Sequence, residues 1–280
     1  MKQRIITALI LAPLVIVGIF KLSLPLFIVA IAAVTMIGFW EWTQFVSASS
    51  RVLALLPTLA VSTASLWFIP FDVFSLNQVQ QPHLVVLAIG CLWWLAASGL
   101  AITYPKSSSL WQSSKWLRHG FGVLTLLPFF WSVILLRAEG IDNDAYHGAR
   151  LVLYVCLIVW AADSGAYFAG KSLGKHKMAP HVSPNKTIEG LIGGMITALV
   201  IGWVTAQWFD IQFSSYWAMV VITLATVVIS VLGDLVESMF KRVAGIKDSS
   251  NIIPGHGGVL DRIDSLTAAF PVFAFLYFIF

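Results

Sequence analysis

The chain has 280 residues, of which 59% are hydrophobic and only 11% are charged, and its mean hydropathy is +0.87. This composition excludes a soluble globular domain and indicates an integral membrane protein. The net charge of +4 has to be interpreted by the location of the cations, and it does not indicate a nucleic-acid partner.

Apolar runs of about 17 to 25 residues recur along the chain, and each is long enough to cross a bilayer as a helix. Lipid-facing backbone must satisfy its own hydrogen bonds, which favours a helix bundle, and the short alternating segments of a β-barrel are absent. We therefore predict an all-α polytopic integral membrane protein with about nine transmembrane helices and a cytoplasm-facing polar active-site cavity. The predicted spans are 5–20, 24–42, 52–69, 84–104, 121–137, 150–170, 188–208, 216–240 and 264–280.

The first span could be mistaken for a signal peptide cleaved at Ala30-Ile31-Ala32. That interpretation is disfavoured, because Lys21 ends the first apolar run and a longer run continues through Trp42.

The cations predict the orientation of the spans. With a cytoplasmic N-terminus, fourteen of the seventeen Lys and Arg residues fall on the inside, as the excess of positive charge in cytoplasmic loops requires. The outer segments then keep only Lys21, Arg137 and Arg150, and the C-terminus lies outside. The inside cations are Lys2, Arg4, Arg51, Lys106, Lys115, Arg118, Lys171, Lys175, Lys177, Lys186, Lys241, Arg242, Lys247 and Arg262.

The stretch 105–119 is the most polar loop of the first half and carries Trp111 and Trp116 among its cations. We expect it to lie along the membrane interface as an amphipathic segment. It divides the chain into N-terminal transmembrane helices with an interfacial loop, residues 1–119, and a C-terminal catalytic portion, residues 120–280.

Three further residues in the apolar runs receive structural interpretations. Glu41, between Trp40 and Trp42, is expected to be an interfacial anchor rather than a catalytic acid. Cys91 and Cys156 lie inside apolar runs and are expected to be buried small hydrophobic residues rather than a disulfide or a metal pair.

The stretch from 233 to 264 is polar although long apolar runs lie on both sides of it. It holds five of the thirteen acidic residues of the chain. They are Asp234, Glu237, Asp248, Asp261 and Asp264. Ionisable groups at membrane depth are costly and usually face a cavity or a partner. Asp163, Asp234 and Glu237 interrupt predicted helices near the same face of the membrane, so we expect one cytoplasmic-side cavity to contain them.

The spacing within this stretch favours a metal–phosphate site. On a helix, Asp234, Glu237, Ser238 and Lys241 share one face, and Asp261 and Asp264 are three residues apart at the start of the last span. Two such faces would place oxygen ligands around one or two hard cations. Mg²⁺ is the usual ion where substrate phosphates complete its coordination. Between the faces, Gly255, Gly257 and Gly258 would let backbone N–H groups approach phosphate oxygens.

Two upstream segments are candidate substrate contacts. Asp163 is expected either to line the cavity and meet a cation or substrate hydroxyl, or to lock helices together as part of a polar pair. In the loop from Lys171 to Glu189, Thr187 should open a helix beside Lys186, an arrangement suited to an anion. The alternative for this loop is ordinary positive charge beside a membrane.

These residues resemble a known family. The pattern Ser238-x-Phe240-Lys241-Arg242, Lys247-Asp248 and Pro254-x-His256-Gly257-Gly258-Val259-x-Asp261-Arg262-Ile263-Asp264 resembles the signature of phosphatidate cytidylyltransferases, also called CDP-diacylglycerol synthases. The segments Asp163-Ser164-Gly165-Ala166-Tyr167 and Ser183-Pro184-x-Lys186-Thr187 also resemble the bacterial enzymes. The resemblance covers nearly the whole chain and is strongest after residue 120.

The resemblance implies transfer of CMP from CTP to phosphatidic acid, giving CDP-diacylglycerol and pyrophosphate in phospholipid biosynthesis. It implies Mg²⁺ as cofactor, with room for a second metal ion, and a multi-pass location in the bacterial inner membrane with the active site and N-terminus cytoplasmic. Besides the membrane lipid, the partners are the two substrates, and a homodimer remains open.

The resemblance also implies roles for the residues. Asp234 and Asp261 are the favoured metal ligands, with Asp264 and Glu237 in support. Contacts to substrate phosphates are expected from Lys241, Arg242, Lys247 and Arg262, and a phosphate cradle from Gly257 and Gly258. The remaining candidates are Asp248 and His256 in the catalytic loop and Asp163, Lys171, Ser183, Lys186, Thr187 and Ser238 at the substrates.

Two alternatives remain. A CTP-dependent lipid kinase would share a metal–CTP site on membrane helices, and its products would be a phosphorylated lipid and CDP. A transporter or channel would place polar residues at several depths across the bilayer, whereas here they cluster on one side.

Overall fold

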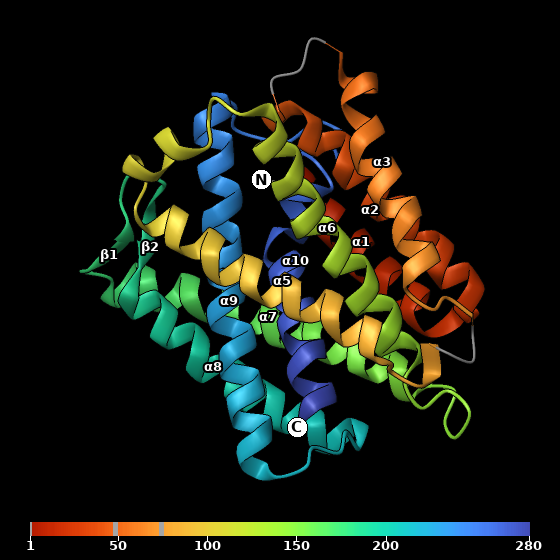
Figure 1. The fold of residues 1–280 in the computed structure, drawn as a ribbon. Helices are drawn as coiled ribbons and strands as arrows, with labels where there is room; N and C mark the ends of the chain where they lie inside the picture. Colours follow the sequence, from red (N-terminus) through yellow and green to blue (C-terminus); the bar gives the residue numbers. More distant parts are fainter. Residues whose placement is uncertain (1, 47–49, 73–75) are drawn as a thin grey trace.

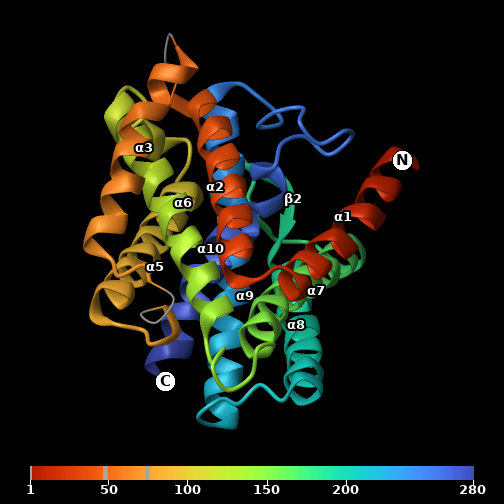
Figure 2. The ribbon, with the colours of Figure 1, turned by 90° about the vertical axis from the view of Figure 1, so that its right-hand side faces the viewer.

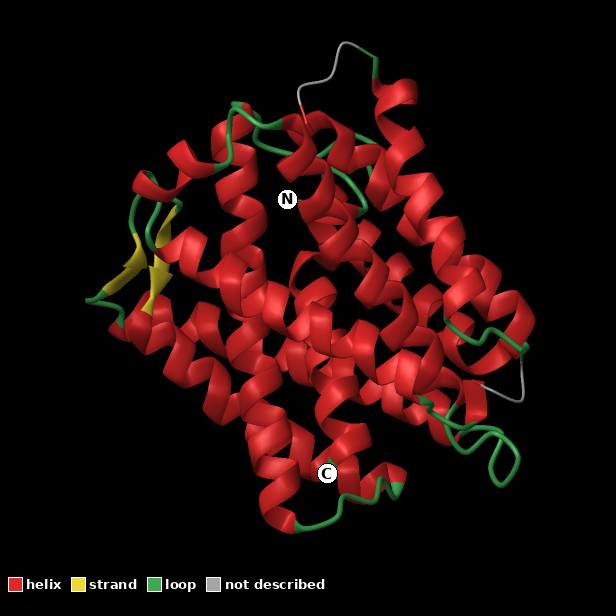
Figure 3. Cartoon of the chain, viewed as in Figure 1, coloured by secondary structure: helices red, strands yellow, loops and turns green. Residues whose placement is uncertain are grey.

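The computed structural model describes residues 2–46, 50–72 and 76–280. Its described part is a bundle of nine long α-helices with one short 3₁₀ helix and one small β-hairpin (Figures 1 and 3). The elements are α1 (Lys2–Lys21), α2 (Leu24–Val46), α3 (Arg51–Phe68), α5 (Gln81–Ile102), η1 (Lys106–Leu110), α6 (Lys115–Ala138), α7 (His147–Leu173), β1 (Lys177–Ala179), β2 (Ser183–Thr187), α8 (Ile188–Phe209), α9 (Tyr216–Ala244) and α10 (Leu260–Ile279).

Each predicted span corresponds to one of these nine helices, which confirms the all-α membrane class. Eight of them, namely α2, α3 and α5 to α10, are long and apolar enough to cross a membrane. The exception is α1, whose apolar part is the shorter stretch Leu9–Lys21. In Figure 2, α1 lies at the edge of the bundle, with its first turns directed away from the other helices.

The helix ends follow from local sequence. Ser114 and Ser215 are N-caps whose side chains accept hydrogen bonds from the backbone N–H groups of Leu117 and Ala218. After α9 the backbone turns at Gly245 with φ +69°, a left-handed conformation that glycine adopts without a steric cost. Four helices contain an internal proline, as membrane helices tolerate where neighbours satisfy the freed carbonyl groups.

An aromatic core joins the two portions of the chain near the end of α9. Phe240 on α9 packs against Trp42 and Phe45 of α2, against Trp111, and against Phe121 of α6. Helices from before residue 120 therefore share a core with the helices that carry the candidate site.

The segment 105–119 is not a single amphipathic helix. It forms η1, a turn and the start of α6, and Trp111 is only 1% exposed because it fills the aromatic core beside Phe240. Trp116 does match the expected surface position, with 77% exposure.

The β-hairpin was not predicted from the sequence. Strands β1 and β2 pair antiparallel, with Lys177 opposite Thr187 and Ala179 opposite Ser183. The tip of the hairpin is held against α9, because Arg242 donates a hydrogen bond from Nε to the carbonyl oxygen of Val182 at 3.2 Å. The basic loop between α7 and α8 is therefore a folded element placed beside the polar face of α9.

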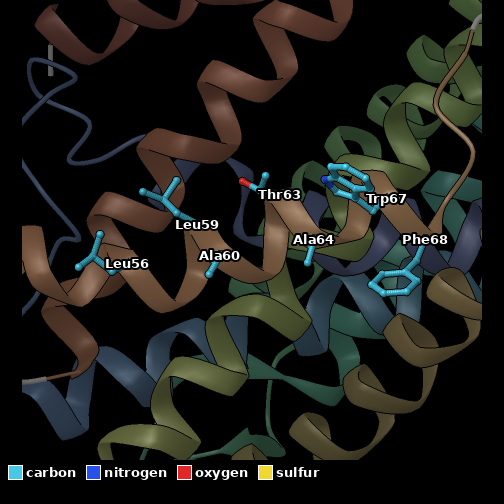
Figure 4. Close-up of a pocket in the computed structure, with 7 residues that line it drawn as sticks. All are labelled: Leu56, Leu59, Ala60, Thr63, Ala64, Trp67 and Phe68. Atoms are coloured by element: carbon cyan, nitrogen blue, oxygen red, sulfur yellow. The ribbon is translucent and has the colours of Figure 1, made fainter.

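A surface hollow of about 730 Å³ lies along α3 (Figure 4). Leu56, Leu59, Ala60, Thr63, Ala64, Trp67 and Phe68 line it. None of these side chains is ionisable, and in a membrane such an apolar helix face is covered by lipid. We therefore place the candidate site elsewhere.

Candidate active site

One face of α9 carries the first group of polar side chains. The predicted i, i+3, i+4 and i+7 spacing is realised, since Ser238 Oγ donates to Asp234 Oδ1 at 3.3 Å and Lys241 Nζ lies 3.0 Å from Glu237 Oε2. Glu237 is buried, and Lys241 is mostly buried with a side chain 15% exposed.

Helix α10 brings the second carboxylate face against the first. Lys241 Nζ also contacts Asp261 Oδ1 at 2.9 Å, so a single ammonium group bridges acids of two helices. The helices approach closely because Gly233 has no side chain: a Cβ there would lie 2.7 Å from Ala268 Cβ. The carboxyl groups of Glu237 and Asp264 consequently interact directly with each other.

Lys186 of the hairpin and Asp163 of α7 complete the cluster. Lys186 Nζ lies 2.6 Å from Asp234 Oδ2 and donates to the carbonyl oxygen of Val231 at 3.1 Å. Asp163 interacts electrostatically with Asp234, Asp264 and Lys186. Its side chain is exposed, which leaves the cluster open at the surface of α7. The three segments singled out in the sequence therefore meet at one place.

This polar cluster carries an excess of negative charge. It contains the carboxyl groups of Asp163, Asp234, Glu237, Asp261 and Asp264. Against these five acids stand only the two ammonium groups of Lys186 and Lys241, and neither of them forms an ion pair with Asp163 or Asp264. In addition, Glu237 Oε1 is buried with no hydrogen-bond partner among the described residues. Carboxylates that lie close together without enough cations repel one another, so the arrangement favours binding of a further cation.

Asp261 differs from the other acids because the protein satisfies both of its oxygens. Oδ1 accepts from Lys241, and Oδ2 accepts from Ser249 N at 2.8 Å, Ser249 Oγ at 2.9 Å and Gly258 N at 2.7 Å. Asp261 therefore holds the loop 245–259 against the start of α10.

The glycine turn is packed against the same carboxylate. Gly257 has φ +84°, and a Cβ there would lie 2.6 Å from Asp261 Oδ2. Gly258 is buried, and a Cβ would lie 2.0 Å from Ser249 Oγ and 2.6 Å from Glu41 Oε1. The N–H of Gly258 donates to Asp261 Oδ2. Close packing against Asp261, Ser249 and Glu41 is therefore enough to explain both glycines without the expected phosphate cradle.

Glu41 is not an interfacial anchor, and the interpretation from its tryptophan neighbours was wrong. Its side chain is completely buried in the protein, at the end of α2 that lies beside the loop 245–259. It accepts hydrogen bonds from Ser249, Ser250, Val259 and Leu260. The signal that could have revealed this role is an acid inside a predicted span, the same signal that selected Asp163.

The remaining candidates form no ion pair with the cluster in the described part of the chain. Thr187 is the N-cap of α8 and accepts from Gly190 N at 3.1 Å, which confirms the predicted helix start. His256 is half-buried, and its Nδ1 atom has no hydrogen-bond partner among the described residues. The exposed candidates are Lys171, Arg242, Lys247, Asp248 and Arg262, and Ser183 is half-buried in β2.

The donor chemistry of the cluster fits a hard divalent cation. All its candidate ligands are carboxylate oxygens, which Mg²⁺ prefers, and the charge excess has the right sign. Within the described chain, no group of three or more His, Cys, Asp or Glu side chains is arranged to hold a metal by itself. That result agrees with the usual protein site for Mg²⁺, in which one or two carboxylates act together with substrate phosphates.

Comparison with known proteins shows a consistent set of relatives. A family model for the cytidylyltransferase family matches residues 2–280. The chain is 44% identical to a phosphatidate cytidylyltransferase of Haemophilus influenzae, and the alignment covers 99% of both chains. It is 42% identical to the enzyme of that name from Pseudomonas aeruginosa over 99% of this chain and 96% of the relative. With the Bacillus subtilis enzyme the identity is 34%, over 100% and 97% of the two chains.

Proposed function

Because this chain belongs to the cytidylyltransferase family, we propose that it transfers the CMP group of CTP to phosphatidic acid, with release of pyrophosphate. The observation that carries the proposal is the cluster of acids and lysines from α7, β2, α9 and α10, most of which lie in the segments that resemble the family. In the reaction, an oxygen of the lipid phosphate forms a bond to the α-phosphorus of CTP. The bond from that phosphorus to the bridging oxygen of the β-phosphate breaks.

This chemistry explains which residue types are present. The nucleophile is a phosphate that is already ionised at neutral pH, so a strong general base is not required. The main barrier is repulsion between the anionic lipid phosphate and the triphosphate, which fixed cations reduce. Lys186 and Lys241 lie inside the cluster, and the exposed side chains of Arg242, Lys247 and Arg262 are further cations for phosphate oxygens.

We assign the metal role to the carboxylates of the cluster other than Asp261. One or two of Asp163, Asp234, Glu237 and Asp264 would hold Mg²⁺ together with substrate phosphates, with room for a second ion, while Asp261 keeps the loop in place. When bound, Mg²⁺ would neutralise charge on the reacting and leaving phosphate oxygens. Before any ion or substrate arrives, Lys186 and Lys241 partly neutralise the same carboxylates.

The open side of the cluster suits a lipid substrate. Asp163 and Tyr167 are one turn apart on α7, and both side chains are exposed. Phe168 is also exposed, at 68%, so an apolar membrane-facing surface adjoins the acidic cluster. A phosphate at the membrane surface could reach the cluster while its acyl chains stay in the bilayer.

The location follows from the substrates. CTP is cytoplasmic, so we propose that the cluster faces the cytoplasm from the inner membrane of a bacterium and that the N-terminus lies on the same side. All residues named in the site come from one chain, so the proposal does not require a homodimer.

The test is incubation of the purified protein in detergent with CTP, phosphatidate and Mg²⁺, with and without EDTA. We expect CMP-linked lipid and pyrophosphate, with loss of both in EDTA. A parallel reaction with a lipid alcohol tests the kinase alternative. Phosphorylated lipid and CDP from that reaction, without any CMP-linked lipid from phosphatidate, would overturn the proposal.

A further inference from the structure

The loop 245–259 is held in place by an acid from a distant part of the chain. Glu41 lies on α2, more than 200 residues before the groups that it contacts. Oε1 accepts from Ser250 Oγ at 2.5 Å and Val259 N at 3.0 Å, and Oε2 accepts from Ser249 Oγ at 3.1 Å and Leu260 N at 2.6 Å. Gln44, one turn further along α2, adds a hydrogen bond to the carbonyl oxygen of Ser249.

These contacts replace a cap that α10 does not supply for itself. The first N–H groups of a helix have no partner within the helix, and a side chain at the N-cap usually accepts from one of them. The N-cap of α10 is Val259, which has no suitable side chain. Glu41 accepts instead from the N–H groups of Val259 and Leu260, and its negative charge suits a helix N-terminus.

The same hydroxyl group links Glu41 to the cluster. Ser249 Oγ lies within hydrogen-bond distance of Glu41 Oε2 and of Asp261 Oδ2, and it is completely buried. Asp261 in turn contacts Lys241, which contacts Glu237. A continuous path of polar contacts therefore runs from α2 through the loop to the acids of α9.

We infer that Glu41 is a positioning residue for the reaction, an inference that rests on the proposed function. It acts through Ser249 and Asp261 to fix the start of α10, and with it the orientation of Asp264 toward Glu237 and Asp234. The side chain itself does not touch substrate or metal. The N-terminal helices are then part of the catalytic scaffold, although the acids of the cluster itself lie on α7, α9 and α10.

The experiment uses the full-length protein with Glu41→Gln, which has nearly the same shape. Glutamine keeps one acceptor oxygen but presents an NH₂ group to donors that need a second acceptor. We expect the catalytic rate to fall by about 10²-fold, because a displacement near 1 Å at a reacting site can cost that much. The Mg²⁺ concentration that gives half-maximal activity should rise, while the KM for phosphatidate changes little. Glu41→Asp, which keeps the charge, should restore part of the rate and of the Mg²⁺ dependence.

Glu139→Gln is the matched control. Glu139 is a half-buried acid at the C-terminal end of α6, whereas the N-terminal end of α6 is the one that contacts α2 near Glu41. This variant should behave as the unaltered protein. Ser249→Ala tests the link independently and should also raise the Mg²⁺ requirement, in case Glu41→Gln does not fold. An unchanged Mg²⁺ requirement in Ser249→Ala and in folded Glu41→Gln, or equal loss for both substrates together with a fall in Tm, would overturn the positioning role. An unaltered protein that forms no CMP-linked lipid would instead overturn the proposed function.

Discussion

At the scale of single residues, the acids of the cluster differ in how many protein hydrogen bonds and ammonium groups stabilise their negative charge. Asp261 accepts four hydrogen bonds from the protein, including one from an ammonium group. By contrast, Asp264 faces Glu237, and one oxygen of Glu237 has no donor within the described residues. Removing a charge should therefore have different consequences at the two aspartates, although both belong to the same short motif.

Asp264→Asn should abolish the Mg²⁺-dependent activity and the Mg²⁺-dependent rise in Tm without harming the fold. It removes one like charge from a crowded group, so the Tm without Mg²⁺ should equal or exceed that of the unaltered protein. Activity should fall by about 10²-fold or more. Added Mg²⁺ should raise the Tm of the unaltered protein by mass action, but not that of the variant. The measurements are thermal unfolding with and without Mg²⁺ and CMP transfer, with Asp142→Asn as the control.

A second result would contradict this assignment. If Asp264→Asn keeps near-normal turnover at limiting Mg²⁺ while Asp261→Asn loses the Mg²⁺-dependent rise in Tm, then Asp261 rather than Asp264 is the ligand.

Gly258→Ala should disturb the loop itself. An added Cβ would meet Ser249 Oγ at 2.0 Å and Glu41 Oε1 at 2.6 Å, and both of these atoms are buried and hydrogen-bonded. We expect faster proteolysis within 245–259, a lower Tm and lower activity toward both substrates.

Gly120→Ala is the control, because nothing lies within 4 Å of its added Cβ. It should be neutral or stabilising by about 0.5–1 kcal/mol, since alanine is favoured over glycine in a helix. Normal stability of Gly258→Ala with a raised KM for CTP alone would instead support the phosphate cradle.

At the scale of elements, the long helices could be predicted and the short polar pieces could not. Apolar runs such as that of α9 are long enough to predict a membrane-spanning helix from local sequence alone. The spacing of Asp234, Glu237 and Lys241 correctly placed them on one face of that helix. The hairpin β1–β2 has only three and five residues, and its position depends on contacts with α9 that no local pattern reveals. Glu41 was misassigned for the same reason, because its partners lie more than 200 residues away.

The hairpin should contribute to CTP use through Lys186. Lys186→Gln keeps a donor for the carbonyl oxygen of Val231 but removes the positive charge next to Asp234. We expect kcat/KM for CTP to fall by about 10-fold or more, because a charge-assisted contact contributes about 1.5–3 kcal/mol. Lys177→Gln, on the exposed part of the same hairpin, should have little effect in the same steady-state assay. Equal effects of both changes would mean that the hairpin contributes only a diffuse positive potential.

At the scale of the whole molecule, the clustered acids and lysines of the candidate site lie at one end of the bundle. The loop 245–259 and the end of α2 lie at this end, whereas the 210–215 turn and the C-terminus lie at the opposite end (Figures 1 and 2). A transporter would need polar groups at successive depths. Five of the thirteen acids instead meet in one cluster that is shared by α7, α9 and α10. The asymmetry is that of an enzyme that meets its soluble substrate on one side of the membrane.

This asymmetry predicts which single cysteines an impermeant thiol reagent can reach from outside the cell. Single cysteines at Asn185 and Asn251, both exposed near the cluster, should resist an impermeant thiol reagent in intact cells and react after permeabilisation. Cysteines at Asn143 and Gln212, exposed at the other end, should react in intact cells. The native Cys91 and Cys156 are free thiols, so both are first replaced by alanine to remove background labelling. The fourteen-to-three distribution of cations requires this outcome if positive charge is retained in the cytoplasm. Labelling at Asn251→Cys from outside would place the acids and lysines on the side without CTP. The proposed reaction could then not occur at this cluster, whatever the sequence relationship.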